Sequence, residues 1–355
     1  MRPGAALVPM LVAACASFHE DSATPDAHAP RLDAALRDAR LPDATHGRDA
    51  PETSDVARPV DAKGADAAPG PAWSAEVSGV FGDDLNAVWG SSATDVYAVG
   101  GNGTIVHSKG DGVWTTQPSQ FAIGSFLGVW GSGATQVYAV TDAGYICSSV
   151  GTGTWSCSTV AQDLTAVCGP AAESYYYVVS QLGVITRVTG PMSQVSEEDT
   201  GGAFGFFGIW GSSATDVYAA ADDGQIFHST GTGTWTSEPG GQMGAGGTVW
   251  GSSAADVYAA GGTVLYHSSG GGTWTIAPTP TSVTVTLSGV WGSAASDVYV
   301  VGDRGTVLHT TGAGAYTTEV TASSSNLFAV WGSGAGDVYA VGSGGAILHR
   351  NPPSP

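Results

Sequence analysis

Short, mostly apolar runs alternate with turns rich in Gly, Ser, Thr and Asp along the chain from residue 73 onward. Leu85–Trp89 and Val96–Val99 are two such runs, separated by a Gly-Ser-Ser-Ala-Thr-Asp turn. Runs of four to six residues predict β-strands, because helices need at least about 10 residues. No stretch of that length after residue 72 shows helical periodicity. The pattern therefore predicts an all-β domain.

One sequence unit is repeated seven times in this domain. Each copy reads as four short strands, and six of the seven contain a Trp-Gly dipeptide at the end of the first strand. Successive copies are 41, 38, 42, 40, 41 and 40 residues apart. Seven units of this length match the blades of a β-propeller. The first-strand Trp residues are Trp89, Trp130, Trp210, Trp250, Trp291 and Trp331, with Cys168 in that place in the third unit.

The two ends of the domain predict a closed ring. The last unit stops after its third strand, at Ile347–Arg350, and the Pro352-Pro353 pair prevents a central strand beyond it. A strand that resembles the missing fourth one, Trp73–Val77, precedes the first unit. We expect it to complete the last blade and so to remove an exposed sheet edge. The expected domain is a seven-bladed propeller over residues 73–350, with a tail at 351–355.

The turn before the fourth strand resembles a known repeat. In the fourth unit, residues 229–235 read Ser-Thr-Gly-Thr-Gly-Thr-Trp, which resembles the Asp-box, or BNR (bacterial neuraminidase), repeat Ser-x-Asp-x-Gly-x-Thr-Trp. The turn is one residue shorter and lacks the Asp. The complete unit is similar to those of bacterial propellers related to photosystem II assembly factors. The resemblance implies propeller architecture and no particular activity.

The first 15 residues resemble a bacterial lipoprotein signal. Arg2 supplies a positive charge, and residues 5–14 form an apolar run that is too short to span a bilayer. The resemblance implies a signal peptide over residues 1–14 and lipidation of Cys15. Ala16, rather than Asp, after the Cys implies the outer membrane. Ordinary secretory cleavage within Ala14-Cys15-Ala16 is the alternative. We expect an exported protein at the cell envelope. Which side of the outer membrane it faces is left open.

Residues 15–72 connect this signal to the propeller. They are rich in Ala, Asp, Pro and Arg and contain almost no aromatic residues. Such a segment cannot bury enough apolar surface to offset the entropy lost on ordering. We expect a disordered tether with a reach on the order of 40 Å as a flexible coil.

Charge excludes two classes of partner. The formal net charge is −20, and residues 73–355 contain 4 Lys or Arg against 20 Asp or Glu. So few cations cannot neutralise a row of phosphates, which excludes nucleic acid, and they cannot bind an anionic membrane surface. Contact with a membrane is expected through the lipid anchor alone.

Residues that recur in most blades are expected to build the scaffold. The repeated Trp residues predict packing between blades rather than ligand stacking. The repeated His residues occupy one position in five different blades, too far apart to share a cation, so we expect no metal and no cofactor. The repeated Asp residues precede Val-Tyr and are expected to cap their own turns. The His residues are His107, His228, His267, His309 and His349, and the Asp residues are Asp95, Asp216, Asp256, Asp297 and Asp337.

Cys147 and Cys157 lie on neighbouring strands of the second unit, on either side of the turn 151–153. Their hairpin placement in an exported protein predicts a disulfide bond.

A unique site is expected where the repeat changes most, between residues 188 and 207. We interpret this segment as a long rim loop, in which acidic and exposed aromatic side chains form a binding patch. Degeneration of one blade is the alternative interpretation. The candidate residues in the segment are Glu197, Glu198, Asp199, Phe204, Phe206 and Phe207, and their neighbours on the rim are Asp222, Asp223, Asp303 and Arg304.

These features favour a monomeric, non-catalytic binding or assembly module that presents one propeller face to an envelope protein or polysaccharide. One alternative is a multivalent lectin with one sugar site per blade. Another is a carbohydrate-active hydrolase or lyase with an acidic rim site. The propeller has only Arg187, Arg304 and Arg350, whose spacing argues against a sialidase-like Arg cluster. The sequence contains no Gly-x-Ser-x-Gly, His-Glu-x-x-His or phosphate-loop motif.

Overall fold

The computed structural model describes residues 73–350, except for 120–123, 161–162, 170–174, 191–193, 203, 245, 313 and 322. The predicted signal peptide, Cys15, the tether and the C-terminal tail lie outside the described residues. Within the described part of the chain, no helix is long and apolar enough to cross a membrane.

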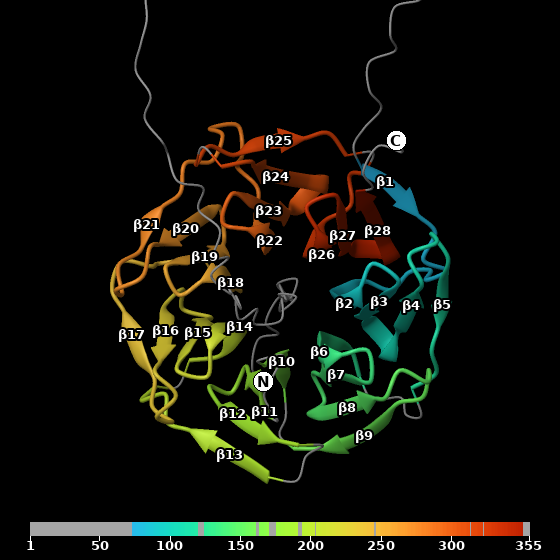
Figure 1. Ribbon diagram of the computed structural model, residues 1–355, viewed down its shortest axis with the longest axis horizontal. Coiled ribbons are helices and arrows are strands. Elements are labelled where there is room, and N and C mark those ends of the chain that lie inside the picture. The colour runs from blue at the N-terminus through green and yellow to red at the C-terminus, as the bar shows by residue number, and fades with distance from the viewer. Residues whose placement is uncertain are drawn as a thin grey trace, which may run out of the picture. The chain divides into compact units, whose positions relative to one another are not determined.

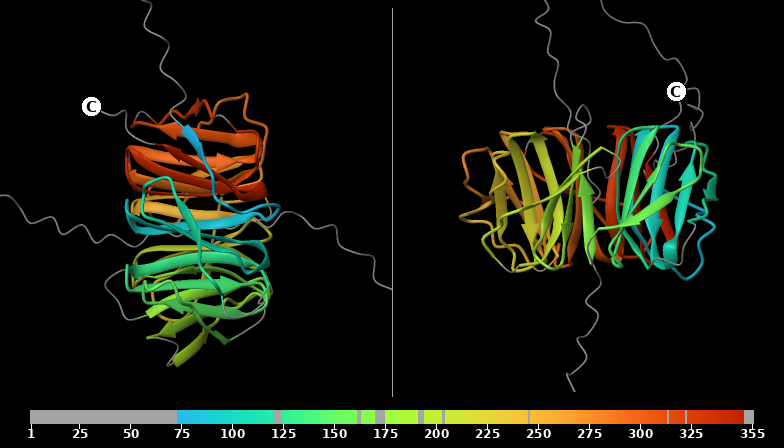
Figure 2. Two further views of the ribbon diagram at one scale, coloured as in Figure 1. Left: turned by 90° about the vertical axis from the view of Figure 1, so that its right-hand side faces the viewer. Right: turned by 90° about the horizontal axis from the view of Figure 1, so that it is seen from below.

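Seven four-stranded antiparallel sheets form the blades of a ring (Figure 1). The first strand of each blade lies nearest the ring axis and the fourth forms the outer edge, as Figure 1 shows. Figure 2 shows the same ring from two of its sides. Blade 1 contains β2 (Leu85–Ser92), β3 (Asp95–Gly100), β4 (Ile105–Ser108) and β5 (Trp114–Thr116). Blade 2 contains β6 (Phe126–Gly133), β7 (Gln136–Thr141), β8 (Tyr145–Ser149) and β9 (Ser156–Thr159). Blade 3 contains β10 (Leu164–Cys168), β11 (Tyr175–Ser180), β12 (Ile185–Thr189) and β13 (Gln194–Glu198).

The remaining blades repeat this order of strands. Blade 4 contains β14 (Phe206–Ser213), β15 (Asp216–Ala221), β16 (Ile226–Ser229) and β17 (Thr236–Glu238). Blade 5 contains β18 (Thr248–Ser253), β19 (Asp256–Gly261), β20 (Val264–Ser268) and β21 (Thr275–Ile276). Blade 6 contains β22 (Leu287–Ala294), β23 (Asp297–Gly302), β24 (Thr306–Thr310) and β25 (Thr317–Glu319). Blade 7 contains β26 (Leu327–Gly334), β27 (Asp337–Gly342), β28 (Ala346–Arg350) and β1 (Trp73–Glu76). Short 3-10 turns link the second and third strands in three blades: η1 (Gly101–Gly103), η2 (Asp303–Gly305) and η3 (Ser343–Gly345).

The N-terminal strand closes the ring, as predicted. β1 pairs antiparallel with β28, with Trp73 opposite Arg350 and Glu76 opposite Ile347. Blade 7 is thus built from both ends of the domain, and its inner strand β26 packs against β2 of blade 1. The seven-bladed propeller expected from the repeat is confirmed.

Each Trp-Gly dipeptide has a direct packing function. The Trp ring of one blade lies over the Gly of the next, so that a Cβ atom added to Gly90 would be 2.6 Å from Cη2 of Trp331. This close approach holds the two blades together across the point where the ring closes. Only Gly leaves room for the indole. The same contact is made by Trp89 on Gly131, Trp130 on Gly169, Trp210 on Gly251, Trp250 on Gly292 and Trp291 on Gly332.

A disulfide joins the two outer strands of blade 2. Cys147 of β8 is directly opposite Cys157 of β9, with their Cα atoms 4.0 Å apart. The bond links the outermost strand of this blade to its neighbour.

Removing β1 should destabilise the whole ring. A chain that begins at residue 79 loses Trp73, which is fully buried, and leaves β28 as an exposed edge. We expect a loss of at least roughly 3–5 kcal/mol in unfolding free energy, together with aggregation. The measurement is chemical and thermal unfolding beside a chain that begins at residue 70. Equal unfolding midpoints for the two chains would show that β1 does not close the ring.

Adding a single methyl group at a Trp-Gly contact should also destabilise the fold. Gly90→Ala places a Cβ atom 2.6 Å from Trp331 and 2.7 Å from the Asp95 carbonyl oxygen, which costs about 1–3 kcal/mol. Gly133→Ala is the matched control, because its Cβ would meet nothing within 4 Å. Thermal unfolding should separate the two variants, and similar melting temperatures would refute the Trp-on-Gly contact.

Candidate binding site

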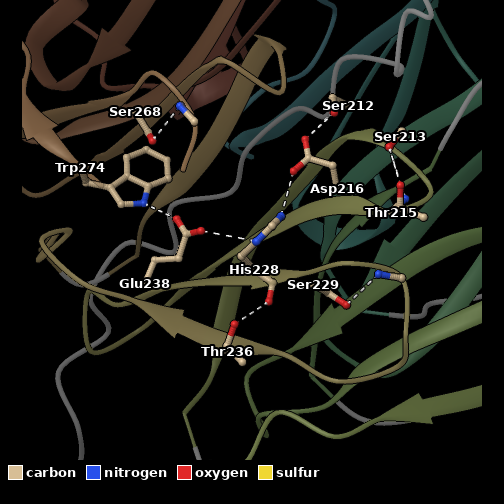
Figure 3. Close-up of polar contacts among 12 residues, drawn as sticks. Ser212, Ser213, Thr215, Asp216, His228, Ser229, Thr236, Glu238, Ser268 and Trp274 are labelled. Atoms are coloured by element: carbon tan, nitrogen blue, oxygen red, sulfur yellow. Dashed lines mark hydrogen bonds and ion pairs between the residues drawn. The ribbon is translucent and has the colours of Figure 1, made fainter. Parts of the chain in front are cut away.

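The residues shared by most blades form chains of hydrogen bonds that cross from one blade to the next. Figure 3 shows the chain in blade 4, where Ser212 donates to the Asp216 carboxylate. Asp216 Oδ1 lies 2.8 Å from His228 Nε2, and His228 Nδ1 lies 3.4 Å from Glu238 Oε1. The chain ends in blade 5, where Trp274 Nε1 donates to Glu238 Oε2 at 2.7 Å. The repeated Asp, His and Trp residues therefore join neighbouring blades.

The corresponding chain of hydrogen bonds in blade 7 has shorter distances around its His. His349 Nε2 lies 2.7 Å from Asp337 Oδ1, and its Nδ1 lies 2.7 Å from Glu76 Oε1. Glu76 Oε2 accepts a hydrogen bond of 2.7 Å from Trp114 Nε1 of blade 1. The His349 ring also stacks on Tyr339 at 3.8 Å between centres. Blade 6 has the corresponding contacts from Asp297, His309 and Glu319 to Trp73.

The acidic residue of this chain was not predicted from the sequence. The sequence does contain a signal for it, namely its distance from the fourth-strand Trp. Glu76 and Glu238 each follow such a Trp by three residues. Glu319 follows Tyr316 at the same distance. The Asp residues were expected to cap their own turns, and they do accept from a nearby Ser, as Asp95 does from Ser91 at 2.5 Å. The second carboxylate oxygen of each Asp contacts the His on the third strand. The sequence pattern of the turn does not reveal this contact.

A Ser, an Asp and a His in one chain are not enough for nucleophilic catalysis. The Ser212 hydroxyl donates to Asp216 rather than to His228, so no base is in place to deprotonate it. Among the described residues, no group of three or more His, Cys, Asp or Glu side chains could hold a metal ion. We therefore interpret these chains as parts of the scaffold.

Blade 3 departs from this arrangement. Tyr175 stands where other blades have Asp, and Arg187 stands where they have His, because Arg187 pairs with Tyr177 as His107 pairs with Tyr97. The Arg187 guanidinium carbon lies 3.9 Å from the centre of the Tyr175 ring. Its Nε atom is buried and has no hydrogen-bond partner within the described part of the chain.

A cavity of about 330 Å³ lies beside Arg187, between blade 3 and the turn 231–233 of blade 4. The blade 3 wall comes from one face of β12 and β13, where Arg187 is opposite Ser196 and Thr189 is opposite Gln194. The turn is held in place because Asp199 N–H donates to the Gly233 carbonyl at 3.1 Å. The cavity is therefore formed by two blades and by no single repeat.

Glu198 is a further residue of the cavity wall. Trp235 Nε1 of blade 4 donates to its Oε2 at 2.8 Å, as in the scaffold chains. Burial raises the pKa of the Glu198 carboxyl above its usual range, although the hydrogen bond from Trp235 and the charge of Arg187 act in the opposite direction. Glu198 thus belongs both to the blade junction and to the cavity.

The prediction of a rim loop between residues 188 and 207 is wrong. Residues 194–198 form strand β13, the fourth strand of blade 3, so the segment completes the repeat. Glu197 is exposed and lines the cavity with Glu198, whereas the Asp199 carboxylate accepts from Gly201 N–H at 2.9 Å.

The three Phe residues do not form an exposed patch. Phe206 is buried in β14, Phe207 is half-buried, and Phe204 packs against the core. Phe206 contacts Phe227 edge to face, with ring centres 5.4 Å apart. Their place in the sequence, between two strands, did not show that they would fill the interior.

The other rim candidates lie away from the cavity. Asp222 and Asp223 are exposed in the turn between β15 and β16, at the opposite end of β16 from the turn 231–233. Asp223 accepts hydrogen bonds from Gln225. Asp303 and Arg304 form the turn of blade 6, where Arg304 N–H donates to Asn326 at 3.0 Å. The structure does not bring these residues together with Glu197 and Glu198.

Comparison with known proteins supports the class of fold. No protein-family model and no curated protein matches the chain. Among solved structures, YCF48 bound to a D1 peptide has a TM-score of 0.66 at 12% identity, over 81% of this chain and 97% of that one. YCF48 from Cyanidioschyzon merolae has a TM-score of 0.63 at 13% identity, over 79% and 98%. A catalytically inactive virginiamycin B lyase from Staphylococcus aureus with quinupristin has a TM-score of 0.64 at 14% identity, over 78% and 98%.

These similarities identify the chain as a β-propeller. At such low identity they establish the fold alone, and they include a protein solved with a bound peptide and a lyase. The assignment of a function therefore rests on the features of this chain.

The hydrogen bonds of His349 should make stability depend on pH. Burial alone would lower the pKa of the His349 imidazole, but its bonds to Asp337 and Glu76 outweigh burial and raise that pKa from 6.5 to about 8. A raised pKa means that protonated His349 stabilises the folded state. This stabilisation, about 1–2 kcal/mol, is complete below pH 6.5 and is lost as the pH rises through about 8.

The test compares unfolding free energies at pH 6 and pH 9. We expect the native chain to be less stable at pH 9, and we expect His349→Gln to reduce the difference between the two pH values. His228 and His309 also have raised pKa values, so part of the difference should remain. An unchanged difference in the variant would show that His349 does not contribute.

Proposed function

We propose that this protein is a non-catalytic binding module whose propeller presents one unique site, the cavity between blades 3 and 4. One observation carries the proposal. Blade 3 replaces the Asp and His of the scaffold chain with Tyr175 and Arg187, and the replacement borders a cavity. In blades 1, 4, 5, 6 and 7 these positions hold the Asp–His pair of the scaffold. Blade 2 has Gln136 and Ser148 there, so blade 3 differs from it in carrying a charged Arg beside an aromatic ring.

The repeat-based lectin is a weaker alternative for the same reason. A sugar site in each blade would need repeated polar and aromatic side chains that are free to contact a ligand. The fourth-strand Trp rings of blades 4 and 5 are buried, and their N–H groups bind Glu198 and Glu238. The chemistry that the blades share is therefore already used within the scaffold.

The second alternative, a carbohydrate-active hydrolase or lyase with an acidic rim site, is also less well supported. Glu197 and Glu198 are consecutive residues of β13, so their side chains point to opposite faces of the sheet. Two such carboxylates cannot flank one glycosidic bond. Glu198 is in addition held by Trp235. A binding role fits this arrangement better than acid–base catalysis.

The proposed place of action is the cell envelope. The signal-like residues before Cys15 support export and lipid anchoring, with the outer membrane as the expected location, and residues 15–72 would serve as the tether. A protein or polysaccharide of the envelope is the proposed partner. The described similarity to YCF48, solved with a D1 peptide, supports the use of such a propeller for binding.

Blocking the cavity should abolish partner binding. Thr232 is exposed at the centre of the turn 231–233 and lines the cavity. Thr232→Tyr should fill the cavity and reduce retention of the partner at least about tenfold, since interface energy is concentrated at few contacts. Thr152→Tyr is the matched control, because Thr152 is exposed in the identical Gly-Thr-Gly-Thr-Trp turn of blade 2.

The measurement uses the full-length chain immobilised in detergent and exposed to fractionated envelope protein and polysaccharide. A component that is retained by the native chain and by Thr152→Tyr, but not by Thr232→Tyr, supports the proposal. Equal retention by both variants would show that the cavity is not the binding site.

A further inference from the structure

The cavity wall offers hydrogen-bond donors and acceptors side by side. The Arg187 side chain can only donate hydrogen bonds, and the ionised Glu198 side chain can only accept them. Gln194, Ser196 and Thr232 can do both. Arg187, Ser196 and Glu198 lie on one face of the two outer strands of blade 3, since Arg187 is opposite Ser196 and side chains alternate along a strand. A ligand that pairs with all of them needs several groups that both donate and accept hydrogen bonds.

Charge limits the ligand further. The positive charge of Arg187 acts on the Glu198 carboxylate beside it, so the wall combines both signs at short range. Residues 73–355 contain 20 acidic and 4 basic residues. Arg187 attracts an anion that Glu198 repels, and the reverse holds for a cation, so the wall favours neither sign of charge. A neutral ligand meets neither obstacle.

Arg187 is already oriented for such a ligand. Its guanidinium lies 3.9 Å over the Tyr175 ring, which covers one face and leaves the N–H edges to form hydrogen bonds. Arg187 itself lines the cavity, so its N–H groups other than that of the buried Nε are the ones available to a ligand oxygen.

The size of the cavity suits one small ring. Its volume of about 330 Å³ is at the lower end of the range of roughly 300–1,000 Å³ that is usual for small-molecule sites. Vicinal hydroxyl groups on such a ring present paired donors and acceptors with the spacing that a guanidinium and a carboxylate can use.

We propose that the cavity binds one neutral sugar residue of a glycan, with Arg187 and Gln194 donating to its oxygens and Glu198 accepting from a hydroxyl. This inference rests on the proposed function, because it names the ligand class of the same site. The glycan is then the part of the envelope that the module recognises.

The test titrates the full-length chain with methyl glycosides of glucose, galactose and N-acetylglucosamine, followed by saturation-transfer NMR. Glucuronate and glucosamine serve as charged counterparts. We expect at least one neutral glycoside to bind, and to bind at least tenfold more tightly than either charged sugar. Thr232→Tyr and Arg187→His should each weaken binding at least tenfold, whereas Thr152→Tyr should not. Arg187→His introduces the residue that five other blades have at this position, so it should preserve the fold.

Several outcomes would overturn the inference. Tighter binding of glucuronate or glucosamine would assign the site to a charged ligand. Equal weakening by Thr152→Tyr would place sugar binding elsewhere. If no glycoside binds while Thr232→Tyr still abolishes retention of an envelope component, the sugar assignment fails and the proposed function stands. If Thr232→Tyr affects neither measurement, both fail.

Discussion

The contact between neighbouring blades is the interaction on which this structure depends. A single four-stranded sheet of two- to eight-residue strands cannot bury both of its faces, so each blade is stable only against its neighbours. Two features provide that contact. A Trp ring of one blade packs on a Gly of the next, as Trp331 does on Gly90, and a fourth-strand Trp donates to a carboxylate of the blade before it, as Trp274 does to Glu238. The packing contact requires a Gly, which has no side chain, and the hydrogen bond requires a carboxylate side chain. The Gly position and the carboxylate position are therefore both constrained.

The candidate site lies where this system is altered. Blade 3 has Cys168 in place of the inner-strand Trp and Val195 in place of the fourth-strand Trp, yet it keeps Glu198 to bind Trp235 of blade 4. Arg187 and Tyr175 stack on each other instead of forming the Asp–His pair. The junction between blades 3 and 4 is therefore maintained, and a cavity lies beside it. Neighbouring blades supply the rigidity that such a site requires.

Much of the architecture could be predicted from the pattern of residues, and the site could not. The repeat of about 40 residues and the strand-like segment at Trp73 are local features, and both the number of blades and the closure by β1 follow from them. The segment 188–207 was interpreted as a loop because its residues differ from the repeat. It nevertheless forms β13, because backbone pairing with β12 does not require the repeat's side chains. Phe206 was taken for a surface residue although it is buried in β14, since a sequence pattern alone does not show which side of a strand faces inward at the start of a blade.

The sequence by itself determined the order of the strands, the number of blades and the repeated Trp positions that pack between blades. These depend on contacts that every repeat makes in the same way, so seven copies of one pattern reveal them. Only the tertiary structure decided that Glu198, Arg187 and Thr232 border one cavity. These residues come from different strands of two blades, and the curvature of the ring, to which all seven blades contribute, sets the distance between them.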